Sequence, residues 1–231
     1  MQCPDSSLAL DWEMEQSGPE GILPQIYRAA RQQFSDAPGS HDWEHTLRVL
    51  RLCRRIGPVE GADMMVLEAA ALLHDIGRPF QDASNGTVCH AVRGAAMAGR
   101  IITALPLTAA RKENIVHSVR AHRFRDSHVP ESIEAKVLFD ADKLDAIGAV
   151  GVARAYLFAG ELGACLHNPH LPPEQAEPYS RNDTGYREFS VKLSKIRDRM
   201  LTGEGFRLAR DRHAFMVAFF DRFVEEFEGR C

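Results

Sequence analysis

Cysteine is scarce in this sequence and follows no recognisable pattern. The chain of 231 residues has five cysteines, and no two of them form a Cys-x-x-Cys pair. They are Cys3, Cys53, Cys89, Cys165 and Cys231. An odd number of scattered cysteines indicates neither a disulfide framework nor a zinc–thiolate site, so we expect the protein to work in a reducing compartment.

Long apolar runs and basic clusters are also absent. No apolar stretch reaches the roughly 18 residues of a membrane span. The N-terminus carries Asp5, Asp11, Glu13 and Glu15 where a signal sequence is basic and then apolar. The formal net charge is −4 and no Lys/Arg-rich run occurs, which argues against a nucleic-acid polymer as partner. These absences predict a soluble, cytoplasmic protein without a membrane partner, and they indicate no particular oligomeric state.

Alternation of apolar and polar residues, the pattern of a β-strand, is nowhere sustained, whereas helical periodicity recurs. The length and the apolar content of 45% fit one large core. We therefore predict an all-α fold, with an acidic lead-in over residues 1–20 and a single helical domain over residues 21–231. Helices are expected over 22–34, from 44 to about 57, over 91–105 and 109–122, and from 131 past 146.

A change of composition separates the last part of the chain. Residues 165–185 are rich in Asn, Pro and polar side chains, which predicts a long loop that could cover a site. C-terminal helices are expected over about 186–229. The last of them carries an aromatic stripe that we interpret as core packing. The stripe consists of Phe215, Phe219, Phe220, Phe223 and Phe227.

The apolar run Ala69–Leu73 leads directly into His74 and Asp75, and the helix then stops near Gly77. His74 lies seven residues after Leu67 and so shares the packed face of that helix. A buried imidazole or carboxylate without a partner is costly, so the pair requires a compensating charge. A divalent metal ion is the candidate that we favour.

Two further segments carry matching ligand types. His45 precedes the His74-Asp75 pair, and Asp142 follows it. Two imidazoles and two carboxylates form a mixed nitrogen and oxygen set that suits Mn, Fe, Co, Ni or Zn, and Mg less well.

The three segments together resemble the HD superfamily of metal-dependent phosphohydrolases. The resemblance rests on His-x-x-Arg-Val at 45–49, Leu-Leu-His-Asp-Ile-Gly at 72–77 and Ala-Asp-x-Leu-Asp-Ala at 141–146. It implies an HD-type helical bundle with its core at about 39–160 and additional C-terminal helices. It also implies that the metal ligands are His45, His74, Asp75 and Asp142.

Other residues near these motifs are given supporting roles. His41 lies close to His45 but outside the motif position, so we expect it to support a ligand or to form a turn. Asp145 lies one helical turn from Asp142 and could orient a ligand. His117 is interpreted as structural.

His90 and His122 fall between the His-Asp pair and Asp142, an order that is compatible with two-metal members of the superfamily. The Gly-Tyr-Pro element of the cyclic dinucleotide phosphodiesterases is missing after His122. We favour substrate-binding or proton-transfer roles for both histidines over a second metal. One ion is therefore expected, with two left open.

The predicted function is hydrolysis of a phosphate ester or anhydride in a small molecule, with a nucleotide as the favoured substrate. Asp75 would act as ligand and base, beside the catalytic histidines His90 and His122. Arg78 is the favoured phosphate contact, with Arg48 and Lys143 as further candidates. Two alternatives stay open: a di-iron oxygenase, and a regulatory nucleotide-binding module.

Overall fold

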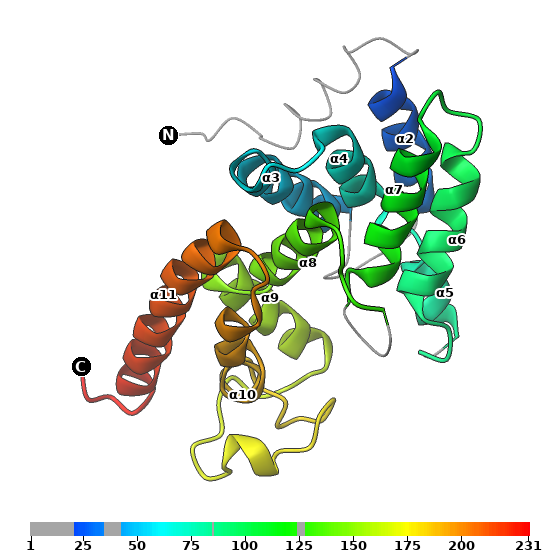
Figure 1. Ribbon diagram of the computed structural model, residues 1–231. Helices are drawn as coiled ribbons and strands as arrows, with labels where there is room; N and C mark the ends of the chain where they lie inside the picture. Colours follow the sequence, from blue (N-terminus) through cyan, green and yellow to red (C-terminus); the bar gives the residue numbers. More distant parts are fainter. Residues whose placement is uncertain (1–20, 35–42, 85, 124–127) are drawn as a thin grey trace, which may run out of the picture. The chain divides into compact units, whose positions relative to one another are not determined.

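The computed structural model describes residues 21–34, 43–84, 86–123 and 128–231 (Figure 1). Among these residues the regular elements are all helical and no strand occurs, which confirms the predicted all-α fold. The chain divides into two compact units, Met1–Ala141 and Asp142–Cys231, and the boundary falls within α8 (Ile133–Asp145). The predicted single domain stays a prediction. The acidic lead-in and His41 lie outside the described residues.

Helix α4 forms the centre of the first unit. Its residues from Val66 to Leu73, apart from Glu68, are at most 1% exposed, as expected of a helix that is surrounded by others. It packs against α2, α3, α6 and α7, and α6 and α7 lie side by side (Figure 1). The elements of this unit before α8 are α2 (Ile22–Arg31), η1 (Gln32–Phe34), α3 (Trp43–Glu60), α4 (Met64–Leu73), α5 (Arg78–Ala83), α6 (His90–Ile102) and α7 (Ala109–Ala121).

The start of α4 is held by a side-chain cap. Asp63 accepts hydrogen bonds from the backbone N–H groups of Met65 and Val66, at 3.0 and 3.4 Å. Burial raises the pKa of Asp63, but hydrogen bonds from Arg111 and from Val66 outweigh it, so the pKa lies below its ordinary value. The cap therefore carries a negative charge at the helix N-terminus, where the helix dipole favours one.

Helix α3 runs past its predicted end near Gly57-Pro58 and finishes at Glu60. Gly57 serves close packing, because a Cβ there would lie 2.5 Å from Leu67 Cδ2 of α4. Gly61, with a φ of 72°, provides the left-handed residue that follows the helix. Either glycine could end a helix, and it is Gly61 that follows the end of α3.

The predicted helical block from 131 past 146 is divided. Helix α8 ends at Asp145, and α9 (Gly148–Glu161) begins at a glycine whose φ is 80°. A left-handed residue interrupts a right-handed helix, which accounts for the break.

The second unit is built from α9, α10 (Gly185–Val191) and α11 (Gly203–Phe227), and α9 packs against both of the others. Two short 3-10 turns, η3 (Leu193–Lys195) and η4 (Arg197–Arg199), connect α10 to α11. Phe220 is 1% exposed and stacks on Phe189 with ring centroids 4.4 Å apart. The interpretation of the aromatic stripe as core was wrong for Phe215 and Phe227, which are 47% and 43% exposed.

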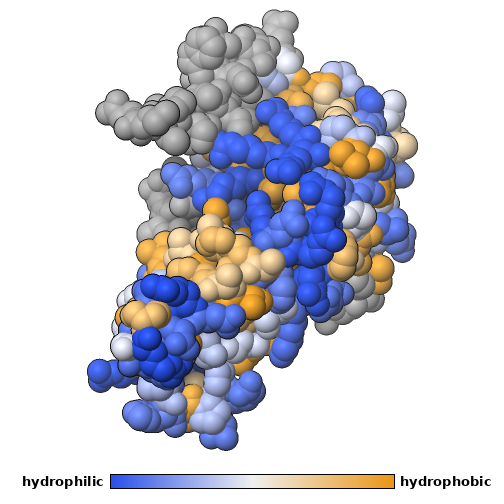
Figure 2. All heavy atoms as spheres, turned by 90° about the vertical axis from the view of Figure 1, so that its left-hand side faces the viewer, coloured by the Kyte–Doolittle hydropathy of each residue, from blue (hydrophilic) through white to orange (hydrophobic). Residues whose placement is uncertain are grey.

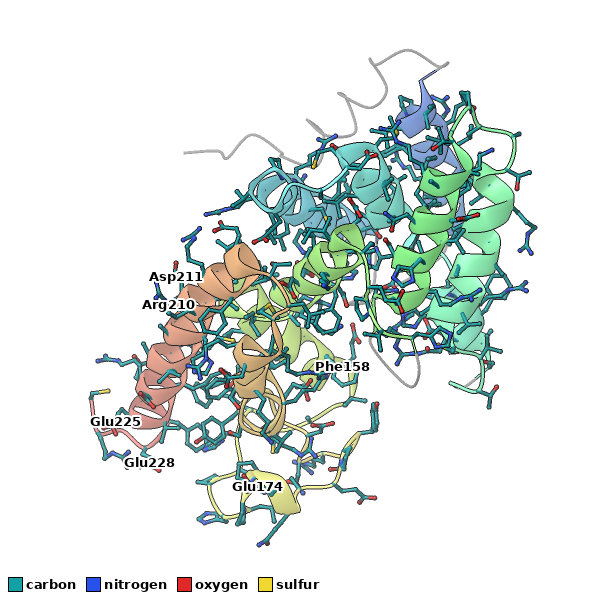
Figure 3. The ribbon with its side chains drawn as sticks, viewed as in Figure 1. Phe158, Glu174, Arg210, Asp211, Glu225 and Glu228 are labelled. Atoms are coloured by element: carbon teal, nitrogen blue, oxygen red, sulfur yellow. The ribbon has the colours of Figure 1, made fainter. Side chains whose placement is uncertain are left out.

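The outer side of α11 is charged. Arg210 and Asp211 project from the helix and form an ion pair at 3.8 Å (Figure 3). Near the C-terminus Arg230 pairs with Glu225 and Glu228, which Figure 3 also labels. Helix α11, with 25 residues, therefore combines a buried side that includes Met216 and Phe220 with a solvated charged one.

The predicted loop 165–185 contains one short 3-10 turn, η2 (Pro173–Gln175), and is otherwise irregular. The backbone N–H of Cys165 donates to the carbonyl of Arg181 at 2.9 Å, which joins the two ends of the loop. Asp183 accepts from the Tyr179 N–H at 2.7 Å and from Arg187 at 2.8 Å. The loop is therefore held by its own hydrogen bonds.

The surface drawn in Figure 2 mixes hydrophilic residues with smaller groups of hydrophobic ones. Among the described residues, no helix is both long enough and apolar enough to cross a bilayer.

Candidate metal centre

The His-Asp pair lies where the central helix of the first unit ends. His74 follows α4 as its C-cap and is fully buried, and Asp75 is 4% exposed. The next helix, α5, starts three residues later at Arg78. The polypeptide therefore places an imidazole and a carboxylate together in the interior, as the apolar run before them predicts.

Gly77 allows α6 to approach this turn. A Cβ on Gly77 would lie 2.2 Å from the carbonyl oxygen of His90 and 2.7 Å from the backbone nitrogen of Gly94. Real structures do not tolerate such contacts, so the close packing of α6 requires glycine here. This approach brings His90, the first residue of α6, next to Asp75.

Four imidazoles face the two oxygens of the Asp75 carboxylate. Oδ2 lies 3.8 Å from His45 Nε2 and 3.9 Å from His74 Nε2. Oδ1 lies 3.1 Å from His90 Nε2 and 3.6 Å from His122 Nε2. The histidines thus form two pairs, with Nε2 atoms 3.3 Å apart for His45 and His74 and 3.1 Å apart for His90 and His122.

Hydrogen bonds at Nδ1 orient three of these rings. His74 Nδ1 lies 2.7 Å from the carbonyl oxygen of Ala71, and His122 Nδ1 lies 2.7 Å from that of Val119. His90 Nδ1 lies 2.8 Å from Gln81 Oε1. An oxygen acceptor requires the proton on Nδ1, so the neutral imidazole presents its Nε2 lone pair toward Asp75.

The electrostatics of the group favour a cation. Burial raises the pKa of Asp75, but positive charge on His74 and hydrogen bonds from His122 and His90 outweigh it, so the pKa lies well below its usual range and the carboxylate is ionised. Where the rings are neutral and turn lone pairs toward Asp75, a cation would have to supply that stabilisation. Burial lowers the pKa of His90, which keeps that imidazole neutral and able to act as a ligand. Lone pairs that converge on an ionised buried carboxylate match a divalent ion with nitrogen and oxygen ligands.

The predicted residues divide between the two units. His45, His74, Asp75, His90 and His122 all belong to the first unit, and the ligand atoms of Asp75, His90 and His122 lie within 4.8 Å of one another. Asp142 lies in the last turn of α8 and opens the second unit. Its role as a ligand stays a prediction.

The predicted supporting residues have partners of their own. Asp142 forms an ion pair with Lys143 at 2.6 Å, and Asp145 forms one with Arg154, also at 2.6 Å. Arg48 lies 3.8 Å from Glu44, one turn before it on α3. The predicted roles of Arg48, Lys143 and Asp145 at the site therefore stay predictions.

Arg78 lies directly beside the histidines. Its Nη1 is 3.3 Å from His90 Nδ1, and its Nε is a buried atom without a hydrogen bond among the described residues. The nearest carboxylate to that Nε is Asp82 Oδ1, at 3.7 Å. This is the position in which the sequence predicts a phosphate contact. His117 accepts a hydrogen bond from the Glu131 N–H at 3.1 Å, as suits a structural residue.

Sequence reasoning missed Gln81. The residue lies on α5, nine positions before His90, and its contact with that ring depends on the packing of α5 against α6. No spacing rule links a glutamine on one helix to a histidine on the next. Only the three-dimensional arrangement identifies it.

Comparison with known proteins identifies the family of the chain. Residues 42–147 match the model of the HD domain. The chain is 34% identical to YpgQ of Bacillus subtilis over 213 residues, which are 89% of this chain and 93% of YpgQ.

Solved structures show the same fold. An HD-superfamily hydrolase from Bacillus thuringiensis aligns with a TM-score of 0.71 at 26% identity, covering 90% of this chain and 97% of that one. The Bacillus subtilis YpgQ structure in complex with ADP aligns with a TM-score of 0.67 at 29% identity, covering 88% and 93%. With its His-Asp motif at the end of a buried helix and this likeness over most of its length, the chain belongs to the HD superfamily.

Proposed function

We propose that this protein is a divalent-metal-dependent phosphohydrolase that acts on a small phosphorylated molecule, with a nucleotide as the favoured substrate. The observation that carries the proposal is the convergence of four imidazole Nε2 atoms on the two oxygens of Asp75, 3.1 to 3.9 Å away. The existence of a YpgQ complex with ADP supports a nucleotide.

We further propose that the centre holds two ions. One oxygen of Asp75 lies toward His45 and His74 and the other toward His90 and His122, so each histidine pair, together with Asp75, would hold one ion. This proposal replaces the single ion favoured on sequence grounds. In the sequence pattern of the superfamily, Asp142 would be the additional ligand beside His45 and His74.

When bound, divalent ions lower the pKa of a coordinated water and polarise a phosphoryl oxygen. Asp75 is ionised, because its pKa is well below the usual range. Its carboxylate is therefore available as a ligand, and its predicted role as a base stays a prediction. The lone pairs of His90 and His122 are directed by the acceptors at their Nδ1 atoms.

Arg78 is suited to bind the phosphate. A guanidinium can donate two parallel hydrogen bonds to phosphate oxygens. The Nε of Arg78 makes no hydrogen bond among the described residues and could donate one of them. Its contact with His90 places this donor beside the histidine pair. Phosphate binding by Arg78 would therefore align a phosphoryl group with the ligand cluster.

Phosphate release tests the proposal. Metal-free protein is supplied separately with Mn, Mg, Co, Ni or Fe and assayed on nucleoside mono-, di- and triphosphates. We expect hydrolysis with at least one metal, loss of it in His74→Ala, and no change in the control His170→Ala, whose residue is exposed. Inactivity of the wild type on every substrate with every metal would contradict the proposal.

A di-iron oxygenase is the second candidate, because two histidine pairs around one carboxylate would also suit two iron ions. Oxygen uptake by the iron-loaded protein distinguishes the two functions. Uptake that depends on a small-molecule substrate, without phosphate release, would favour the oxygenase.

A further inference from the structure

We propose that Gln81 is the positioning residue that makes His90 a ligand; this rests on the proposed metal-dependent function. Gln81 lies on α5, and its Oε1 is 2.8 Å from His90 Nδ1 and 3.5 Å from the His90 backbone nitrogen. His90 itself is buried.

The amide atom that faces His90 is the oxygen. Arg123 Nη1 lies 3.1 Å from the same atom, and a guanidinium can only donate hydrogen bonds. Gln81 Oε1 therefore accepts from Arg123 and from His90 together. This assigns the proton of the neutral His90 ring to Nδ1 and the lone pair to Nε2, which faces Asp75 Oδ1 at 3.1 Å.

His90 needs a side-chain acceptor because of its place in the chain. His74 and His122 each donate to a backbone carbonyl three residues earlier, near the end of their own helices. His90 is the first residue of α6, so no turn of its own helix precedes it. Gln81 supplies from α5 the acceptor that the backbone supplies to the other two rings.

A competing arrangement lies close by. Arg78 Nη1 is 3.3 Å from His90 Nδ1, at the limit of a hydrogen bond. Without the Gln81 oxygen, Arg78 would donate to Nδ1, and the ring proton would move to Nε2. Nε2–H would then donate to Asp75, and His90 would become a hydrogen-bond donor in place of a ligand.

Gln81 thus selects between two states of His90, and the same oxygen accepts a hydrogen bond from Arg123, the residue that follows His122 in the chain. A purely structural glutamine would affect stability without changing which ring nitrogen carries the proton. This difference provides the test.

The experiment compares Gln81→Met, which removes the acceptor at similar size, with Gln81→Glu, which keeps it. Gln175→Met, at an exposed position, is the matched control. Imidazole ¹⁵N spectra of the metal-free proteins report the proton on His90, whose signals are identified by their loss in His90→Gln. Mn²⁺ titration then reports binding.

We expect His90 Nδ1 to carry a proton in the wild type, in Gln81→Glu and in the control, and to carry none in Gln81→Met, where Arg78 would donate to it. Loss of a group that orients a metal ligand typically weakens binding about 10–100-fold. In Gln81→Met we expect the affinity for one of the two Mn²⁺ ions to fall by this factor. In Gln81→Glu we expect the affinity to return to that of the wild type.

Unchanged His90 nitrogen signals in Gln81→Met would overturn the inference, and so would equal damage in Gln81→Met and Gln81→Glu. Gln81→Ala gives the same test should the methionine variant not fold. Because the spectra need neither metal nor substrate, they are independent of the proposed function. Absence of phosphatase activity in the wild type would contradict the proposed function, but the spectra would still test the role of Gln81.

Discussion

Replacing Gly77 by alanine tests how the fold builds the centre. The φ of Gly77 is −85°, which alanine adopts without strain, so only space opposes the change. The added Cβ would meet the His90 carbonyl oxygen at 2.2 Å and the Gly94 nitrogen at 2.7 Å, and both are backbone atoms that cannot turn aside. Overpacking of this kind costs about 1–3 kcal/mol.

Gly99→Ala is the matched control on α6, because its Cβ would meet only Val116 Cγ2, at an ordinary 3.6 Å. Gly99→Ala should stabilise the protein by about 0.4–1 kcal/mol. Denaturant unfolding measures both variants, and thermal unfolding should place Gly77→Ala about 2–12 °C below the wild type. Equal stability of the two variants would refute the close packing of α6 on the His-Asp turn.

Two further perturbations test the cap and the phosphate contact. Asp63→Ala should cost about 1 kcal/mol at neutral pH. Because the folded-state pKa of Asp63 is lowered, its contribution is present above the unfolded pKa and is lost as the pH falls through the folded value. Denaturation at several pH values should therefore show the cost shrinking below about pH 4, and a constant cost would argue against a charged cap. Arg78→Gln should lower kcat/KM for a nucleotide about 10–100-fold, the equivalent of about 1.5–3 kcal/mol for a hydrogen bond to a charged group. The exposed control Arg100→Gln should change little, and equal effects would contradict a specific phosphate contact.

Much of the fold follows from local patterns. In α4 all residues from Val66 to Leu73 except Glu68 are buried, and an apolar run of this kind can be recognised in the sequence. The ends of helices are harder to predict, because the sequence does not show why a glycine is present. Gly57 lies within α3 and allows close packing against Leu67, whereas Gly61 has a φ of 72° and follows the end of the helix.

The aromatic stripe of α11 shows a second limit. Its phenylalanines recur at helical spacing, yet Phe220 is buried and Phe215 is half exposed. Periodicity shows which residues share a face, but the extent of burial depends on how far α9 and α10 cover that face.

The candidate site was predictable in part. The His74-Asp75 pair follows from its position at the end of a buried helix, and the motif spacing indicates His45. The grouping of His90 and His122 on one oxygen of Asp75 depends on the close approach of α6 through Gly77. Sequence spacing carries no information on that approach, so the sequence alone does not determine the number of ions.

The most direct test of the metal centre is the number of Mn²⁺ ions bound per chain after dialysis of metal-free protein against Mn²⁺. Elemental analysis compares the wild type with His90→Gln, which removes one imidazole from the Oδ1 side of Asp75. The account predicts two ions in the wild type and one in the variant. No bound ion in the wild type, or equal numbers in both proteins, would contradict it.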